Sequence, residues 1–206
     1  MNQEELIGIL YRTENVLEYI SAVKALGKIA DVRSAVAILQ TSYRWPFQHD
    51  QVRETCFQAI MKCCNEESLI ACFKKMADIL FGQRDYDGAY ELYNKMHRMC
   101  IENNDKAGEA DSIFGQANVL YAQENLDDAP AAYLRAENIY RDIGKKKELA
   151  LCIGTRANVL YEKGELKAAL AFHEQAKEIF ADIGDMKGKQ DALANIEMIR
   201  EDLIAL

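Results

Sequence analysis

The 206-residue sequence has only two prolines and one tryptophan, and it has no apolar run long enough to cross a bilayer. Proline removes a backbone donor from a helix interior, so its scarcity favours long helices. A spanning helix needs about 20 mostly apolar residues, and we therefore expect neither a membrane span nor a membrane partner. The opening residues, MNQEE, also lack the basic and apolar regions of a secretory signal.

Positive charge is in deficit as well. The chain has 25 Lys and Arg against 33 Asp and Glu, which gives a formal net charge of -8 and a pI near 5.0. A phosphate backbone would be repelled on average, so we expect no nucleic-acid partner.

Motifs for catalysis and metal binding are missing. The sequence has no Gly-rich phosphate loop, no nucleophile elbow and no HExxH. The histidines His49, His97 and His173 fall on separate elements, and we interpret each as a surface or hydrogen-bonded helix residue. Adjacent Cys63 and Cys64 would point about 100° apart on a helix, and no second pair completes a metal site. We therefore predict a non-enzymatic protein without catalytic residues, metal or cofactor.

The six cysteines form no disulfide framework, and no signal peptide precedes them. Such thiols are typical of a reducing compartment, so we expect a cytoplasmic protein.

The sequence does contain an internal repeat. Residues 77–81, 117–121 and 157–161 read ADILF, ANVLY and ANVLY, a spacing of 40 residues. Ala89, Ala129 and Ala169 keep the same step. A fixed period of this length indicates stacked supersecondary units, each of which buries its apolar face against a neighbour. We predict an all-α chain of antiparallel helix pairs.

The apolar spacing predicts the helices of the third unit at residues 150–163 and 166–182, with the lysines 145–147 in the loop before them. Pro130 fits only the first turn of a helix, so the second helix of the second unit should begin near residues 126–128. A last amphipathic helix over 189–204 would cap the array.

The order of small residue, apolar residue, Leu, aromatic residue, turn and Ala resembles the tetratricopeptide repeat. The 40-residue step is similar to the longer-helix variety found in adaptor proteins and kinesin light chains. The resemblance covers residues 70–204 and implies a right-handed α-solenoid. The first unit departs from the pattern: Arg84, like Glu124 in the second unit, stands where the third unit has Gly164, and Met96 replaces a small alanine.

Residues 1–69 follow a different period. Residues 22–29 align with 56–63 at a step of 34, and Asp31 and Asn65 stand in equivalent positions as predicted N-caps. These strings resemble HEAT repeats, of the kind also seen in bilin-lyase-like proteins. We therefore expect HEAT-like repeats over 1–69 and a tetratricopeptide-like array over 70–206, joined by a shared helix at 66–83 without a flexible linker.

The resemblance implies that the first helix of each unit lines a concave groove. The position after the small alanine is Asp78, Asn118 or Asn158 in the three units. An Asn amide can both donate to and accept from a peptide backbone. The aromatic positions and the rest of the predicted floor are Phe81, Tyr121, Tyr161, Lys74, Lys75, Phe114, Thr155 and Asn195. The alternative is that the asparagines face solvent and the aromatic rings fill the seams between helices.

Members of this family that bind chaperone tails use a two-carboxylate clamp. Lys74 and Asn118 match it, whereas Asp78, Leu151 and Thr155 do not. The sequence therefore does not favour binding of an acidic chaperone tail.

The segment 41–49 forms a second candidate surface. Tyr43, Arg44, Trp45 and Phe47 gather there, and aromatic residues beside arginine are typical interface anchors. The alternative is a lid over the N-terminal end of the solenoid.

We expect a protein-interaction adaptor that binds a peptide or helix of a partner protein in its groove. The alternative is a regulatory or accessory factor of an enzyme, in a bilin-lyase-like role through the N-terminal part. A homodimer formed through the last helix is a further option.

Overall fold

A computed structural model describes residues 1–29, 32–42, 50–63 and 66–205 of the chain. Every regular element in these ranges is an α-helix, which confirms the predicted all-α class. The chain divides into two compact units, Met1–Leu92 and Tyr93–Leu206, and the division falls inside one helix, α6 (Tyr86–Glu102).

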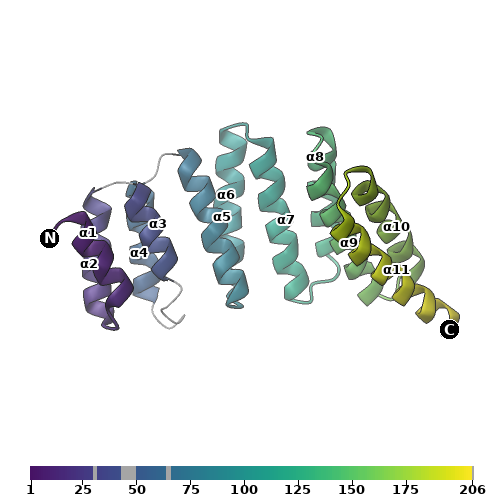
Figure 1. Ribbon diagram of the computed structural model, residues 1–206, viewed down its shortest axis with the longest axis horizontal. Helices are drawn as coiled ribbons and strands as arrows, with labels where there is room; N and C mark the ends of the chain where they lie inside the picture. The colour runs from purple at the N-terminus through teal and green to yellow at the C-terminus, as the bar shows by residue number, and fades with distance from the viewer. Residues whose placement is uncertain (30–31, 43–49, 64–65, 206) are drawn as a thin grey trace. The chain divides into compact units, whose positions relative to one another are not determined.

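The described residues of the first unit form five complete helices. They are α1 (Gln3–Arg12), α2 (Val16–Ile29), α3 (Val32–Ser42), α4 (Asp50–Cys63) and α5 (Glu66–Gly82). Helix α2 packs against α1 and α4, and α3 packs against α4 (Figure 1). Buried Tyr19 ties α2 to α3, because its hydroxyl lies 3.0 Å from Thr41 Oγ1. The predicted caps Asp31 and Asn65 and the candidate interface residues Tyr43, Arg44, Trp45 and Phe47 lie outside the described residues.

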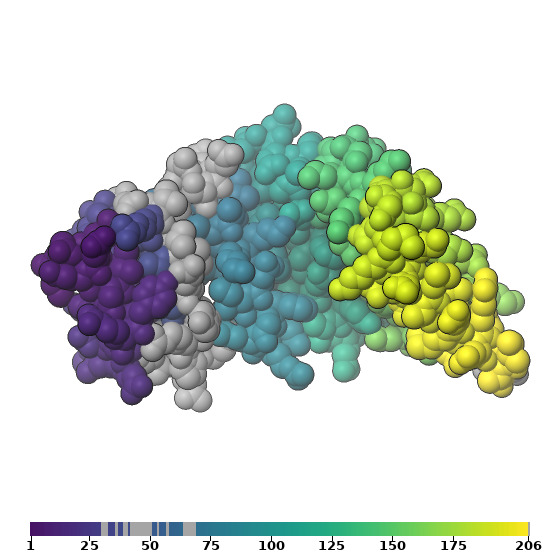
Figure 2. Space-filling model, viewed as in Figure 1, coloured from purple at the N-terminus to yellow at the C-terminus, as the bar shows by residue number. Residues whose placement is uncertain are grey.

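The second unit is a series of antiparallel helices, each packed on the next (Figure 1). The helices are α7 (Lys106–Ala122), α8 (Ala129–Asp142), α9 (Lys146–Glu162), α10 (Leu166–Asp182) and α11 (Met186–Ala205). The space-filling view shows α11 in yellow, lying in front of α9 and α10 (Figure 2).

The predicted bounds of α10 are confirmed, whereas α9 and α11 begin at residues other than those predicted. Helix α9 begins at Lys146 rather than at residue 150, so Lys146 and Lys147 belong to its first turn and not to the loop. Likewise α11 begins at Met186 rather than at residue 189. Both predictions started at the apolar stripe, whereas the first turn of a surface helix is exposed and can be polar.

Helix α8 begins at Ala129 with Asp128 as its N-cap, and this places Pro130 in the first turn, as predicted. Arg156 on α9 joins α8 to α10. It forms two hydrogen bonds of 2.6 and 2.9 Å with the carboxylate of buried Glu137, and its guanidinium lies 3.9 Å from the centre of the Phe172 ring. Burial raises the pKa of Glu137, and the ion pair with Arg156 offsets part of that rise.

The six turns that join α5 through α11 share one backbone feature at 20-residue spacing. The residues with positive φ are Arg84, Asn104, Glu124, Gly144, Gly164 and Gly184, with φ between 54° and 77°. In each turn the next residue donates its N–H to a carbonyl five residues back, as Glu165 does to Leu160 at 2.9 Å. This is the Schellman pattern, which requires a left-handed residue and favours glycine.

Candidate functional site

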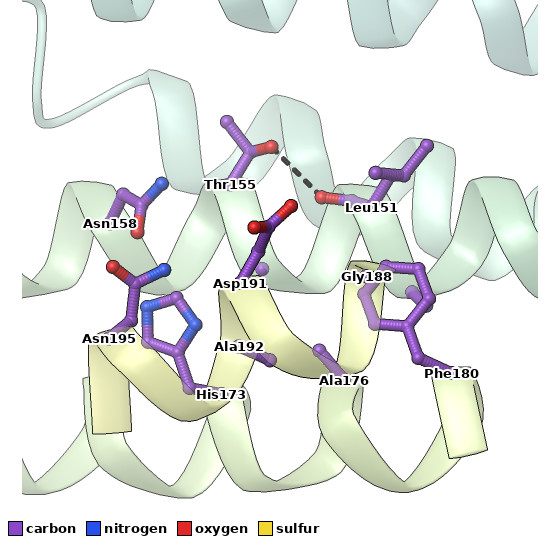
Figure 3. Close-up of a pocket in the computed structure, with 12 residues that line it drawn as sticks. Leu151, Thr155, Asn158, His173, Ala176, Phe180, Gly188, Asp191, Ala192 and Asn195 are labelled. Carbon is purple, nitrogen blue, oxygen red and sulfur yellow. Dashed lines mark hydrogen bonds between the residues drawn. The ribbon is translucent and has the colours of Figure 1, made fainter. Parts of the chain in front are cut away.

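A pocket of about 150 Å³ opens in the second unit between α9, α10 and α11 (Figure 3). Thr155 and Asn158 reach it from α9, and Asn195 reaches it from α11. The structure therefore brings three of the predicted groove residues together around one cavity.

Differences between successive repeats explain why the cavity exists. In the second repeat, the Phe114 ring packs against the buried Tyr133 ring with centroids 5.8 Å apart. The third repeat has Gly154 and His173 at these two positions. A Cβ atom placed on Gly154 would have Ala176 Cβ, 3.9 Å away, as its only near neighbour among the described residues. The missing phenylalanine ring thus leaves the space that becomes the pocket.

The same exchange removes a hydrogen bond between two helices. The Tyr133 hydroxyl donates a 2.7 Å hydrogen bond to Asn118 Oδ1 in the second repeat. His173 in the third repeat is only 2% exposed, and no described residue hydrogen-bonds its ring. Burial lowers the pKa of His173, so its imidazole is neutral at pH 7. His173 is therefore not the surface residue that was one of the two expectations. No described buried side-chain N or O atom lacks a hydrogen-bond partner, so the ring nitrogens of His173 keep some exposure at the pocket.

Polar groups from α9 and α11 surround this histidine. Figure 3 shows the amides of Asn158 and Asn195 close to the His173 ring and the Asp191 carboxylate pointing towards Thr155. Within the described ranges, the side chains of Asn158, Asn195 and Asp191 form no hydrogen bond or ion pair. The Thr155 hydroxyl donates to the Leu151 carbonyl at 2.9 Å, which leaves its oxygen free to accept.

The predicted aromatic positions contact neighbouring helices. The Tyr121 hydroxyl donates to Glu162 Oε1 at 2.5 Å, and the Tyr161 hydroxyl donates to Asp202 Oδ2 at 2.6 Å. Partial burial and the Glu162 carboxylate raise the pKa of Tyr121 to about 12. Each bond joins a repeat to the following one at a separation of 41 residues, so these hydroxyls hold adjacent repeats together.

The remaining predicted groove residues lie apart from the pocket. Asn118 and Phe114 are half-buried on α7 and both contact Tyr133. Lys74, Lys75 and Asp78 are exposed on α5 of the first unit, and the half-buried Phe81 ring there lies 5.7 Å from the Tyr86 ring.

Sequence reasoning missed Gly154, His173 and Asp191 as pocket residues. The signal was present in the 40-residue alignment, because Gly154 replaces Phe114, His173 replaces Tyr133 and Asp191 is in register with Asp111. Asp111 accepts a 2.8 Å hydrogen bond from the buried Tyr140 hydroxyl. Reading the departures from the repeat would have identified the pocket residues.

Cysteines and metal ligands give no second site in the described part of the chain. The described cysteines, Cys56, Cys63, Cys72, Cys100 and Cys152, are buried, and no disulfide joins any two of them. Burial raises the pKa of Cys56 and of Cys100 to about 12, so neither thiol is readily ionised. Among the described residues no group of three or more His, Cys, Asp or Glu could hold a metal ion, and none of the described helices combines the length and apolarity of a membrane span.

Neither a protein-family model nor a curated protein matches the sequence. Solved structures do match. The chain resembles BtubC (BKLC) from P. vanneervenii with a TM-score of 0.58 and 13% identity, over 100% of this chain and 94% of that one. It resembles a STAND signal-transduction ATPase with a tetratricopeptide repeat sensor from Pyrococcus horikoshii with a TM-score of 0.62 and 14% identity, over 98% of this chain and 38% of that one.

A third solved structure is the Rap conjugation gene regulator of the plasmid pLS20 in complex with the Phr* peptide. Its TM-score is 0.56 at 15% identity, over 90% of this chain and 54% of that one. The chain thus spans about half or less of the STAND ATPase and of the Rap regulator. At these identities the likeness concerns the fold, and the chain is an all-α solenoid with a tetratricopeptide-like arrangement of helix pairs.

Proposed function

We propose that this protein is a non-enzymatic adaptor that binds an extended segment of a partner protein along the face formed by α9 and α11. The observation that carries the proposal is the pocket of the third repeat, where Asn158, Asn195 and His173 have no hydrogen-bond partner among the described residues. No described buried side-chain N or O atom lacks a hydrogen-bond partner, so the polar atoms of these three residues are open to solvent at the pocket. A ligand can therefore reach them and replace water as their hydrogen-bond partner.

The geometry suits an extended peptide. An Asn side chain offers one acceptor and two donors, which can pair with successive backbone groups of a peptide whatever its sequence. Asn158 and Asn195 stand on two different helices, so one peptide lying across both could contact them together. The Rap regulator, which has a similar fold, is bound to a peptide in its solved structure, and this supports a peptide as the ligand class.

A selection from a library of random short peptides on the immobilised full chain tests the proposal. We expect enriched peptides that bind the wild-type protein, and we expect Asn158→Ala combined with Asn195→Ala to weaken them by about tenfold or more in fluorescence anisotropy. Gln175→Ala, at an exposed position on α10, is the matched control and should bind as the wild type does. Failure to enrich any peptide, or equal binding by the double variant, would contradict the proposal.

A further inference from the structure

The pocket has the size of one side chain. Its volume of about 150 Å³ is near that of an engineered protein cavity that holds one benzene molecule. Much of its wall is apolar, formed by Gly154, Ala176, Ala192 and the Phe180 ring. A long aliphatic stem could bury its methylene groups against such a wall while its end reaches the polar groups.

Charge around the pocket has one sign. Asp191 is the only lining residue that carries a formal charge at pH 7, because His173 is neutral. Lys187, one helical turn before Asp191 on α11, is exposed and does not line the cavity. Two other acids of this region are paired: Asp185 lies 3.0 Å from Lys147, and Glu174 lies 2.8 Å from Arg200. Asp191 has no such cation within the described part of the chain.

The pocket is also lined by several hydrogen-bond acceptors. Asn158 and Asn195 each present a carbonyl oxygen, and neutral His173 has one ring nitrogen that accepts. Figure 3 shows these three side chains grouped at one end of the pocket, with Asp191 between them and Leu151. An ammonium group has three donors and a guanidinium has five, and neither has an acceptor, so both match a site rich in acceptors.

From these features we propose that the pocket takes a lysine or arginine side chain of the bound peptide, with Asp191 as its counter-ion and Asn158, Asn195 and His173 as hydrogen-bond acceptors. The proposal rests on the proposed function, since the side chain belongs to the peptide bound there. An acidic side chain would face Asp191 without a lining cation. A wholly apolar side chain would leave buried His173 without a partner, and such a group is costly to bury unpaired.

An NMR titration of the full-length protein tests the proposal without a known partner. The probes are N-acetyl-L-arginine amide, N-acetyl-L-lysine amide and N-acetyl-L-citrulline amide, the last of which has the shape of the first without its charge. We expect saturable shifts of the Gly154, Asn158 and Asn195 signals with the two cations, at a dissociation constant on the order of 1 mM. Citrulline should bind about tenfold more weakly or not at all.

Variants localise the binding. Asp191→Asn keeps the shape of an exposed side chain and should weaken the arginine probe by about tenfold. Gly154→Phe places a ring where the second repeat has Phe114, and it should remove binding. Glu178→Gln neutralises a different exposed acid, which lies on α10, and should leave binding unchanged. Circular dichroism confirms that each variant is folded.

The outcomes separate the two proposals. Absence of saturable shifts, equal binding of citrulline, or full binding by Asp191→Asn would each overturn the basic-side-chain pocket. If the arginine probe binds but no peptide is enriched, the pocket stands and the adaptor function fails. If enriched peptides require Asn158 and Asn195 but contain no basic residue that contributes to affinity, the function stands and the pocket assignment fails.

Discussion

At the scale of single residues, His173 is one position where the third repeat departs from the second. Tyr133, its equivalent, donates a 2.7 Å hydrogen bond to Asn118. We predict that His173→Tyr forms the same bond with Asn158 and raises the free energy of unfolding by about 1 kcal/mol. Tyr133→Phe should lower it by about as much, and urea denaturation measures both. A destabilised His173→Tyr would mean that the two repeats pack differently around this position.

Titration of the buried histidines should also affect stability. Burial is the largest cause of the lowered pKa of His173 and of half-buried His97. The unfolded state then binds more protons, so stability falls as the pH drops below about 6.5 towards the lower folded-state pKa values. The raised pKa of Glu137 has the opposite effect, because it makes the folded state bind the extra proton as the pH falls. We predict a lower free energy of unfolding at pH 5 than at pH 7. In His173→Gln, this free energy should change less steeply with pH. An unchanged slope would show that His173 is well solvated.

At the scale of elements, the interhelix turns differ in how well their residues suit a left-handed backbone. Glu124 has a φ of 60°, whereas Gly164, its equivalent in the next repeat, has a φ of 77°. A side chain in this region is strained, so Glu124→Gly should stabilise the protein by roughly 0.5–1 kcal/mol. Gly164→Ala should destabilise it by about 1 kcal/mol. Thermal unfolding of the pair measures both effects, and the idea fails if both variants shift the melting temperature in the same direction.

At the scale of the whole molecule, the repeat pattern was sufficient to predict the helix pairs but insufficient to predict the pocket. The bounds of α10 and the place of Pro130 follow from local rules for apolar spacing and helix starts. The pocket depends on Gly154 and His173, which lie on different helices and meet only after α9 and α10 pack. The residue on the facing helix decides whether an asparagine amide is hydrogen-bonded. Asn118 accepts a hydrogen bond from Tyr133, whereas Asn158 has no partner among the described residues.

The arrangement of the second unit also predicts which part of the chain can act alone. All pocket residues belong to α9, α10 and α11, and the main buried cluster around them extends through α7 and α8, from Ala110 to Phe180. Because each repeat contacts mainly its neighbours, we expect a fragment of residues 103–206 to fold and to bind the arginine probe with a dissociation constant within about threefold of that of the full chain.

A shorter fragment of residues 145–206 keeps every pocket residue but loses the α7 and α8 part of that cluster. One helix pair and the last helix bury little apolar surface, so we expect this fragment to be largely unfolded and to bind nothing. Circular dichroism and the same NMR titration compare the two. If the longer fragment folds without binding the probe, residues before 103 contribute to the site; if the shorter one folds and binds, α7 and α8 are dispensable for the pocket.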